Sequence, residues 1–100
     1  MSVFGERMGR VRAAMDRHGV DTVLLSVGAD LPWLTGYEAM PLERLTMLVL
    51  PREGGATLVV PRLEAPRVVE RPEVFTLRPW EETEDAVALV AAAAGSPGVV

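Results

Sequence analysis

Hydrophobic residues recur at helical spacing over the first part of the chain. They fall every three or four positions, which places them on one face of a helix. The residues of this stripe are Phe4, Met8, Val11 and Met15. Ser2 is a suitable N-cap before the stripe, and Gly19 is a suitable stop after it. The pattern therefore predicts a helix that begins near Ser2 and ends before Gly19.

Short apolar runs then replace the helical spacing. Residues 20–27 form a nearly continuous run rich in branched side chains, which is typical of a central strand covered on both faces. Residues 45–50 and 56–60 are two further strand-like runs, and the polar segment 51–55 between them contains two glycines suited to a turn. These two runs predict a β-hairpin.

Smaller elements are expected around the hairpin. Asp30 is a candidate N-cap for a short helical turn closed by Gly36, and residues 37–43 are expected to be irregular. A short helix is predicted within residues 63–70, starting near Pro66. A short strand is predicted over residues 74–77.

The C-terminal part combines an acidic run with an alanine-rich segment. The acidic residues suit the positive end of a helix dipole, and residues 86–94 favour a helix strongly. Residues 98–100 resemble the opening of another strand, so we expect the domain to be truncated near its last strand. The order of elements predicts one α/β domain over residues 1–100, with helices flanking a mixed sheet.

Composition and charge exclude several functions. The formal net charge is −4 with both signs well mixed, which argues against a nucleic-acid-binding protein. No apolar run is long enough to cross a bilayer or to act as a signal peptide, so we expect a soluble, cytoplasmic protein. Cys and Lys are absent and His18 is the sole histidine, which rules out a thiol nucleophile, a Schiff base and a two-imidazole metal site in one copy.

No motif supplies a catalytic centre. Ser26 does not meet the G-x-S-x-G pattern of a nucleophile elbow, and no G-x-G-x-x-G is present. The acidic residues lack the alternating spacing of a calcium loop and are better explained as a solvated helix start. The acidic residues in question are Glu81, Glu82, Glu84 and Asp85. We therefore assign no catalytic residue, metal ligand or cofactor site to this chain.

Large apolar side chains also gather in the segment that is expected to be irregular. They lie beside charged residues, a composition typical of interfaces and binding lips. The apolar residues are Trp33, Tyr37, Met40 and Leu42, and the charged ones are Glu38, Glu43 and Arg44. Trp33, Tyr37 and Arg44 are the candidates for contact with a ligand or partner. For Trp33, an equally good alternative is that it caps the edge of the sheet together with Leu34.

Several segments, in order, resemble the N-terminal domain of the creatinase/prolidase family. The clearest is Leu31-Pro32-Trp33-Leu34-Thr35-Gly36-Tyr37, which is similar to the aromatic-Leu-Thr-Gly-aromatic signature of that family. Arg7-Met8-Gly9-Arg10-Val11-Arg12 and Gly19-Val20-Asp21-Thr22-Val23-Leu24-Leu25 precede it. Glu43-Arg44, Leu58-Val59-Val60-Pro61 and Trp80-Glu81-Glu82-Thr83-Glu84-Asp85 follow it.

The resemblance implies a three-layer α/β/α fold with a mixed five- or six-stranded sheet. It also implies a parent metallopeptidase of the aminopeptidase P/prolidase type, an Xaa-Pro peptidase whose divalent metal pair is held by a separate C-terminal pita-bread catalytic domain. That domain is absent here, so no metal residue carries over. By analogy, this chain would contribute to a homodimer and to the mouth of the active site, with Trp33, Tyr37 and Arg44 as lip or interface residues.

Two hypotheses for function remain. In the first, the chain is the non-catalytic N-terminal part of an Xaa-Pro metallopeptidase, inactive alone. In the second, it is a stand-alone binding or dimerisation module for a protein or peptide, without enzymatic activity. Because creatinase shares the architecture and acts on a small non-peptide molecule, the resemblance does not fix the parent's substrate.

Overall fold

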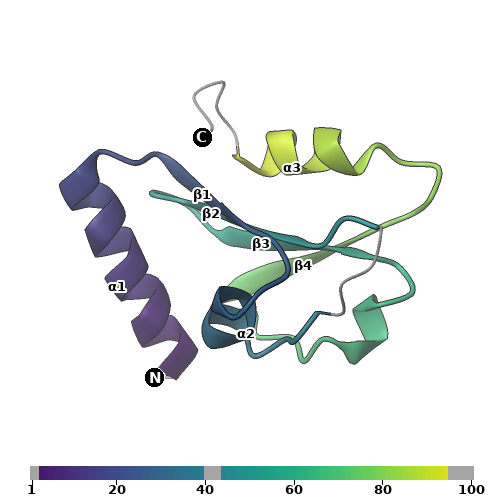
Figure 1. The fold of residues 1–100 in the computed structure, drawn as a ribbon, viewed down its shortest axis with the longest axis horizontal. Helices are drawn as coiled ribbons and strands as arrows, with labels where there is room; N and C mark the ends of the chain where they lie inside the picture. Colours follow the sequence, from purple (N-terminus) through teal and green to yellow (C-terminus); the bar gives the residue numbers. More distant parts are fainter. Residues whose placement is uncertain (1–2, 40–43, 95–100) are drawn as a thin grey trace.

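A four-stranded mixed sheet forms the centre of the computed structural model, which describes residues 3–39 and 44–94. The strands lie side by side in chain order: β1 (Thr22–Leu25), β2 (Met47–Pro51), β3 (Ala56–Pro61) and β4 (Phe75–Trp80). β1 and β3 both pair antiparallel with β2, whereas β3 and β4 are parallel (Figure 1). The predicted hairpin and the mixed sheet are confirmed.

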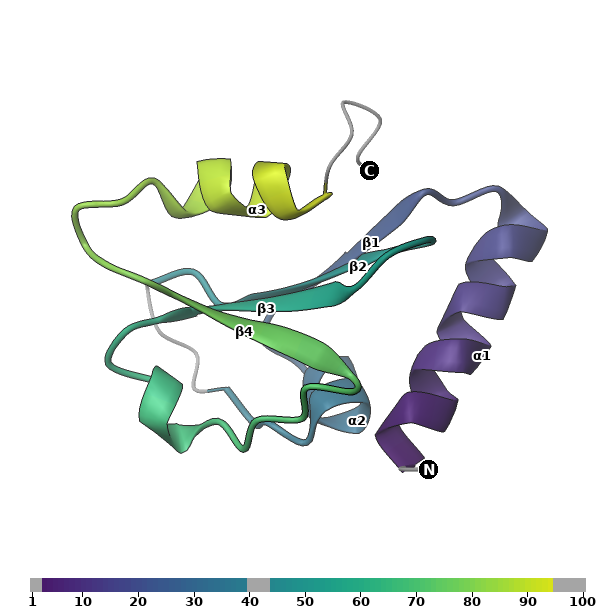
Figure 2. The same cartoon turned by 180° about the vertical axis from the view of Figure 1, so that it is seen from behind.

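Helices cover both faces of this sheet. α1 (Val3–His18) and α2 (Asp30–Thr35) lie on one face, and α3 (Ala86–Ala94) lies on the other (Figures 1 and 2). The described residues therefore form three layers. They contain four strands, and the residues 98–100 predicted to open another strand lie outside the described part. A fifth or sixth strand stays a prediction.

The two central strands bury apolar side chains on both of their faces. Successive side chains of a strand point to opposite faces, so Leu48 and Leu50 pack toward α1 and α2 while Val49 packs with Val90 of α3. β3 repeats the alternation, with Leu58 on the first face. All of these β2 and β3 side chains are fully buried. This double coverage explains why continuous apolar runs form the centre of the sheet.

The first helix matches its predicted stripe. Met8 and Met15 are buried against the sheet, and Phe4 and Val11 pack partly buried beside them. Gly19 follows the helix in the left-handed region at φ 65°, as a C-terminal stop requires. The N-cap predicted at Ser2 lies outside the described residues.

The second helix differs from prediction at its start. Asp30 is the first helical residue and not the N-cap, because Ala29 precedes it in a helical conformation and no side chain caps this end. The predicted stop is confirmed: Gly36 has φ 77°, and its N–H donates to the carbonyl of Pro32 at 2.8 Å.

The first strand was expected in the middle of the sheet and lies at its edge. Within the described residues β1 pairs only with β2, and Val23, Leu24 and Leu25 are half-buried. A central position for β1 requires a further strand on its other side, so it stays a prediction together with the fifth strand. An apolar run indicates that both faces of a strand meet side chains, but it does not specify which strands flank it.

The segment between β3 and β4 also departs from prediction. Residues 63–70 contain only a 3₁₀ turn, Ala65–Arg67, because their apolar side chains do not share one buried face: Val68 is buried, whereas Leu63 and Val69 are exposed. β4 continues past Pro79 to Trp80, where the prediction ended it at residue 77. A proline without an N–H is tolerated there because β4 is an edge strand.

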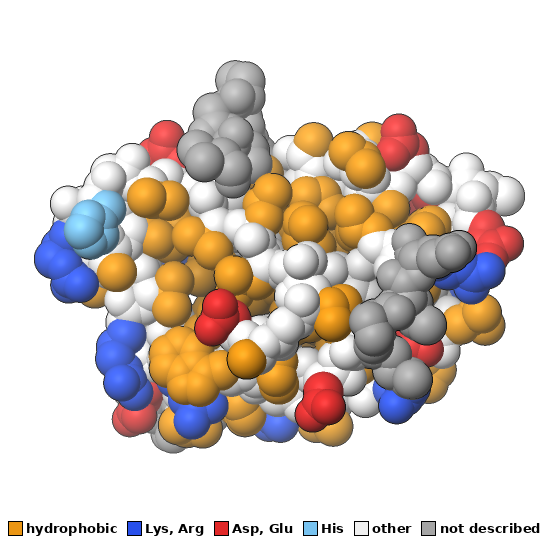
Figure 3. All heavy atoms as spheres, viewed as in Figure 1, with side chains coloured by type: hydrophobic (Ala, Val, Ile, Leu, Met, Phe, Trp, Pro, Cys, Tyr) orange, Lys and Arg blue, Asp and Glu red, His pale blue; other side chains and the backbone are white. Residues whose placement is uncertain are grey.

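The face of the sheet under α3 is only partly covered. α3 contacts β2 and β3, and the hydrophobic residues around this contact stay partly exposed. These are Leu24, Leu45, Met47, Trp80 and Ala93. Figure 3 shows hydrophobic side chains gathered across the middle of this view, below α3, with charged side chains mostly toward the margins. No helix in the described residues is long and apolar enough to cross a membrane.

Candidate functional site

A cavity lies at the carboxyl ends of the two parallel strands. Pro61 and Trp80 are the last paired residues of β3 and β4, and both line it. The cavity has a volume of about 490 Å³. Its lining residues are Arg44, Pro61, Arg62, Leu63, Trp80, Glu81, Glu82 and Thr83. Crevices at the carboxyl ends of strands are the usual ligand sites of α/β sheets, so this is the candidate site.

The apolar wall of the cavity is held by backbone and indole hydrogen bonds. The Nε1–H of Trp80 donates to the carbonyl of Leu45 at 2.9 Å, which ties β4 to the segment before β2. The N–H of Arg62 donates to the carbonyl of Trp80 at 2.9 Å and continues the parallel ladder past Pro61. Leu63 stands on the rim, 72% exposed. An exposed leucine beside an aromatic wall leaves apolar surface available to a ligand.

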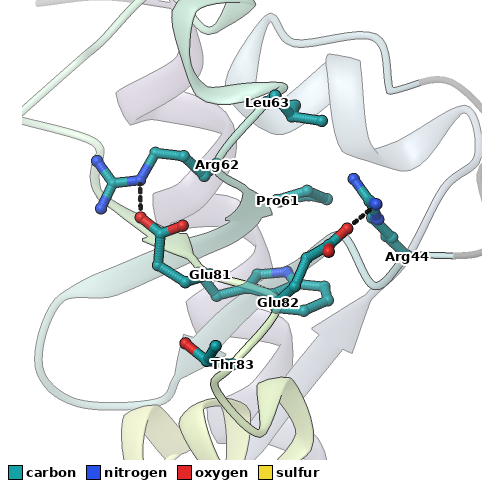
Figure 4. Close-up of a pocket in the computed structure, with 8 residues that line it drawn as sticks. Arg44, Pro61, Arg62, Leu63, Glu81, Glu82 and Thr83 are labelled. Atoms are coloured by element: carbon teal, nitrogen blue, oxygen red, sulfur yellow. Dashed lines mark ion pairs between the residues drawn. The ribbon is translucent and has the colours of Figure 1, made fainter.

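Two ion pairs frame this wall (Figure 4). The Nε of Arg62 lies 2.8 Å from a carboxylate oxygen of Glu81, and Arg44 pairs with Glu82 across the cavity. The four side chains are between 42% and 68% exposed, so each pair stabilises the fold by less than about 1 kcal/mol. Ion pairs of this kind exchange readily with charged groups of a ligand.

Glu84 fixes the turn that carries the two acidic residues of the rim. Its carboxylate accepts the N–H of Glu81 at 2.8 Å and a hydrogen bond from Nη2 of Arg78 at 2.8 Å. The Glu81 N–H and then the Arg78 guanidinium lower the pKa of Glu84 below its ordinary value. Asp85 accepts the N–H of Ala88 at 3.2 Å and so stabilises the start of α3. Part of the acidic run therefore has a structural role.

Trp33 lies away from the cavity, on α2 beside α1. The guanidinium carbon of Arg7 lies 5.0 Å from the centre of the Trp33 ring, and Nη1 of Arg7 donates to the Trp33 carbonyl at 2.8 Å. The same guanidinium lies 5.6 Å from the ring centre of Phe4. The Trp33 side chain nevertheless stays 39% exposed. It is an oriented aromatic surface available for contact.

Tyr37 is buried, and its hydroxyl donates to Oε1 of Glu64 at 3.1 Å. Burial, followed by the bond to Glu64, raises the pKa of Tyr37 to about 12, so the phenol stays protonated. This contact anchors the loop after α2 to the segment directly after Leu63. Tyr37 can therefore act on the cavity through the position of that segment.

Of the three residues that the sequence singled out, the cavity includes only Arg44. Met40, Leu42 and Glu43 lie outside the described residues. Sequence reasoning missed Arg62, Leu63 and Trp80, although Arg62 and Leu63 are the two residues after β3 and Trp80 is the last residue of β4. Recognising them requires the knowledge that β3 and β4 are parallel, because only then do both ends meet at one edge.

Residues 3–39 and 44–94 contain no group of three His, Asp or Glu side chains placed to bind a metal ion. His18 is exposed at the end of α1, and Ser26 is exposed just after β1. Neither residue lies in the candidate site. The described residues that do line the cavity are charged, apolar or, in Thr83, hydroxyl-bearing.

Comparison with known proteins identifies the domain. Residues 7–99 match the Creatinase/Prolidase N-terminal domain. The probable dipeptidase PepE of Mycobacterium tuberculosis (strain ATCC 25618 / H37Rv) is 32% identical over 100 residues, which covers 97% of this chain and 27% of that protein. The crystal structure of dipeptidase PepE from Mycobacterium ulcerans superposes with a TM-score of 0.83 at 35% identity, over 94% of this chain and 26% of that one.

Two further structures share the fold. Prolidase from Thermococcus sibiricus gives a TM-score of 0.76 at 26% identity over 92% of this chain and 25% of that chain. The creatinase/prolidase N-terminal domain of an X-Pro dipeptidase from Streptococcus pyogenes gives 0.75 at 22% identity over 94% and 70%. The chain spans about a quarter of the length of the full dipeptidases and the prolidase. It belongs to the creatinase/prolidase N-terminal domain family.

Proposed function

We propose that this chain is the non-catalytic N-terminal domain of a metal-dependent Xaa-Pro dipeptidase of the aminopeptidase P/prolidase type. In that protein it would contribute to a homodimer and to the mouth of the active site. The observation that carries the proposal is the match of residues 7–99 to this domain, together with coverage of only a quarter of proteins named dipeptidase and prolidase.

The chemistry of the described residues supports a non-catalytic role. They hold no cluster of metal-binding side chains, so the proposed pair of divalent ions would be held by the part of the protein that follows this domain. Metal ions there would activate water for peptide hydrolysis. This chain would supply surfaces that bind and orient.

The candidate mouth residues would act in different ways. Arg44 lines the cavity and can meet a ligand directly. Trp33 offers an exposed ring held by Arg7, which suits contact with a partner subunit or substrate. Tyr37 would act as a positioning residue, because its hydroxyl holds Glu64 beside the rim.

A peptidase assay on the chain and on its longer parent tests this proposal. The purified chain is expected not to hydrolyse an Xaa-Pro dipeptide, even with added Mn²⁺ or Co²⁺, whereas the parent does. In the parent, Trp33→Ala and Arg44→Ala should lower association or turnover more than thermal stability. Arg52→Ala serves as the control, because Arg52 is an ion-paired arginine outside the cavity. Metal-dependent turnover by the chain alone would contradict the proposal. Loss of stability with unchanged activity and association would assign both residues to the fold.

A stand-alone binding module is the second candidate. The exposed Leu63 beside a cavity with two ion pairs favours it, because these features bind without a catalytic partner. The coding sequence after Val100 separates the two candidates. A continuing frame with separated Asp, His and Glu motifs favours the peptidase, and a stop codon with a stably folded product favours the module.

A further inference from the structure

We propose that the cavity at the ends of β3 and β4 binds a small carboxylate that carries an apolar group. The carboxylate would lie on the guanidinium of Arg44, and the apolar group would lie against Trp80, Pro61 and Leu63. This deepens the proposed function by naming the ligand chemistry of the same site. It rests on that function only for the identity of the natural ligand.

The shape and lining of the cavity suit a ligand of this size. Its volume of about 490 Å³ falls within the range of small-molecule sites, roughly 300–1,000 Å³. The Trp80 indole is fixed by its bond to the Leu45 carbonyl, so its ring forms a wall that needs no ordering when a ligand arrives. Leu63 is 72% exposed, and when it covers the ligand part of its apolar surface would be removed from water, which favours binding.

Arg44 is the cation best placed to receive the carboxylate. In Figure 4 it enters from one side of the cavity, with one terminal nitrogen toward Glu82 and the other toward Pro61 and Leu63. A guanidinium has five N–H donors in a planar fork that matches a carboxylate. Among the described contacts only Nη2 is engaged, by Glu82, so donors remain for a second carboxylate. Arg62 instead has its terminal nitrogens directed away from the wall in Figure 4.

The acidic residues of the rim differ in their freedom to move. Glu81 is held through its backbone by Glu84 and through its side chain by Arg62. Among the described residues, the one ion pair or hydrogen bond of the Glu82 side chain is its exposed pair with Arg44, and Glu82 is itself 68% exposed. A ligand carboxylate can therefore take the place of Glu82 on Arg44 at small cost. Once released from Arg44, the Glu82 carboxylate can accept a hydrogen bond from an ammonium group, if the ligand carries one.

Intrinsic fluorescence of this chain tests the proposal. The chain has two tryptophans, so Trp33→Phe leaves Trp80, in the wall of the cavity, as the sole indole. In that background the probes are N-acetyl-leucine, leucine and leucine amide. We expect saturable fluorescence changes with the first two, at dissociation constants on the order of 1–10 mM, and none with leucine amide. If leucine binds with the same affinity as N-acetyl-leucine, the site tolerates the ammonium group.

Substitutions at the ion pair give effects of opposite sign. Arg44→Ala should weaken N-acetyl-leucine binding about tenfold, and Arg44→Lys should weaken it less, because a charge remains without the fork. Glu82→Gln should strengthen binding several-fold, because it removes the carboxylate that competes for Arg44. Arg52→Ala removes an arginine that is ion-paired at 2.6 Å with Asp21, outside the cavity, and should leave binding unchanged.

Circular dichroism confirms that each variant is folded before it is titrated. Leucine amide binding as tightly as N-acetyl-leucine, unchanged binding in folded Arg44→Ala, or weakened binding in Glu82→Gln would each overturn the proposal. These results would leave the peptidase proposal standing, since that one is decided by hydrolysis in the longer parent. Conversely, an inactive parent would leave carboxylate binding by this chain intact.

Discussion

Gly36→Ala should destabilise the domain by more than its backbone conformation alone requires. Gly36 ends α2 at φ 77°, where a side chain costs about 1–2 kcal/mol. A Cβ there would also lie 2.9 Å from Nη2 of Arg71 and 3.1 Å from Cζ of Phe4. Distances this short require a neighbour to move. The substitution therefore tests how tightly the end of α2 is packed.

The neighbour that must move has contacts to lose. Nε of Arg71 donates to the carbonyl of Thr35 at 3.2 Å, and the Arg71 guanidinium lies 4.3 Å from the centre of the Phe4 ring. Losing a charged hydrogen bond and a partly exposed cation–π contact adds about 1–2 kcal/mol. The total expected for Gly36→Ala is about 2–4 kcal/mol. For a domain of this size that lowers Tm by roughly 10–30 °C.

Gly19→Ala is the matched control, because Gly19 also follows a helix at φ 65° but a Cβ there would meet nothing within 4 Å. We expect it to cost about 1–2 kcal/mol, the backbone cost alone. Urea unfolding followed by circular dichroism measures both values. In an Arg71→Ala background, the cost of Gly36→Ala should fall most of the way to that of Gly19→Ala. Equal losses for the two glycines, or an unchanged cost in that background, would refute the packing argument.

Three other predictions concern the titrating groups and the core. Tyr37 is the sole tyrosine, so an absorbance titration should show its ionisation near pH 12, and Glu64→Gln should shift that midpoint down. Because the folded pKa is raised above the ordinary 10.0, the free energy of unfolding should fall as pH rises from 10 to 12. A midpoint near 10 in the wild-type chain would contradict this. Leu58→Ala should cost about 2–5 kcal/mol in urea unfolding, whereas Val87→Ala on the exposed side of α3 should cost under about 0.5; similar losses would place the core elsewhere. Because the pKa of Glu84 is lowered, its carboxylate stabilises the fold above the ordinary value of 4.5, and this stabilisation is lost as pH falls through the folded pKa. Glu84→Gln should therefore flatten the acid limb of a plot of unfolding free energy against pH. An unchanged limb would contradict the lowered pKa.

Local patterns predicted the presence of the three α-helices and of the hairpin. The stripe that contains Met8 and Met15 predicts α1, and glycines predict where α1 and α2 end, because these signals depend on neighbours within a few residues. The start of α2 was misassigned for a related reason. An aspartate suits both the N-cap and the first turn, so Asp30 alone does not fix the boundary.

The place of each strand in the sheet was harder to predict. The apolar run around Val23 has the composition of a central strand, yet β1 pairs on one side only within the described residues. Strand order depends on contacts between segments far apart in sequence, and composition reports only the apolar surroundings. The helix predicted after β3 failed for a related reason, since Val68 is buried there whereas Leu63 and Val69 are exposed.

The candidate site depends most strongly on distant contacts, and this explains why sequence reasoning found one of its members and missed the rest. Arg44 stood out because it is a charged residue in a segment rich in large apolar side chains. Its place at the cavity follows from other causes: the parallel register pairs Pro61 with Trp80, and the Trp80 indole then binds the carbonyl of Leu45, next to Arg44. A register shift of one residue would turn Trp80 to the opposite face and remove both the wall and the link to Arg44. The candidate site of this domain is therefore specified by the β3–β4 register.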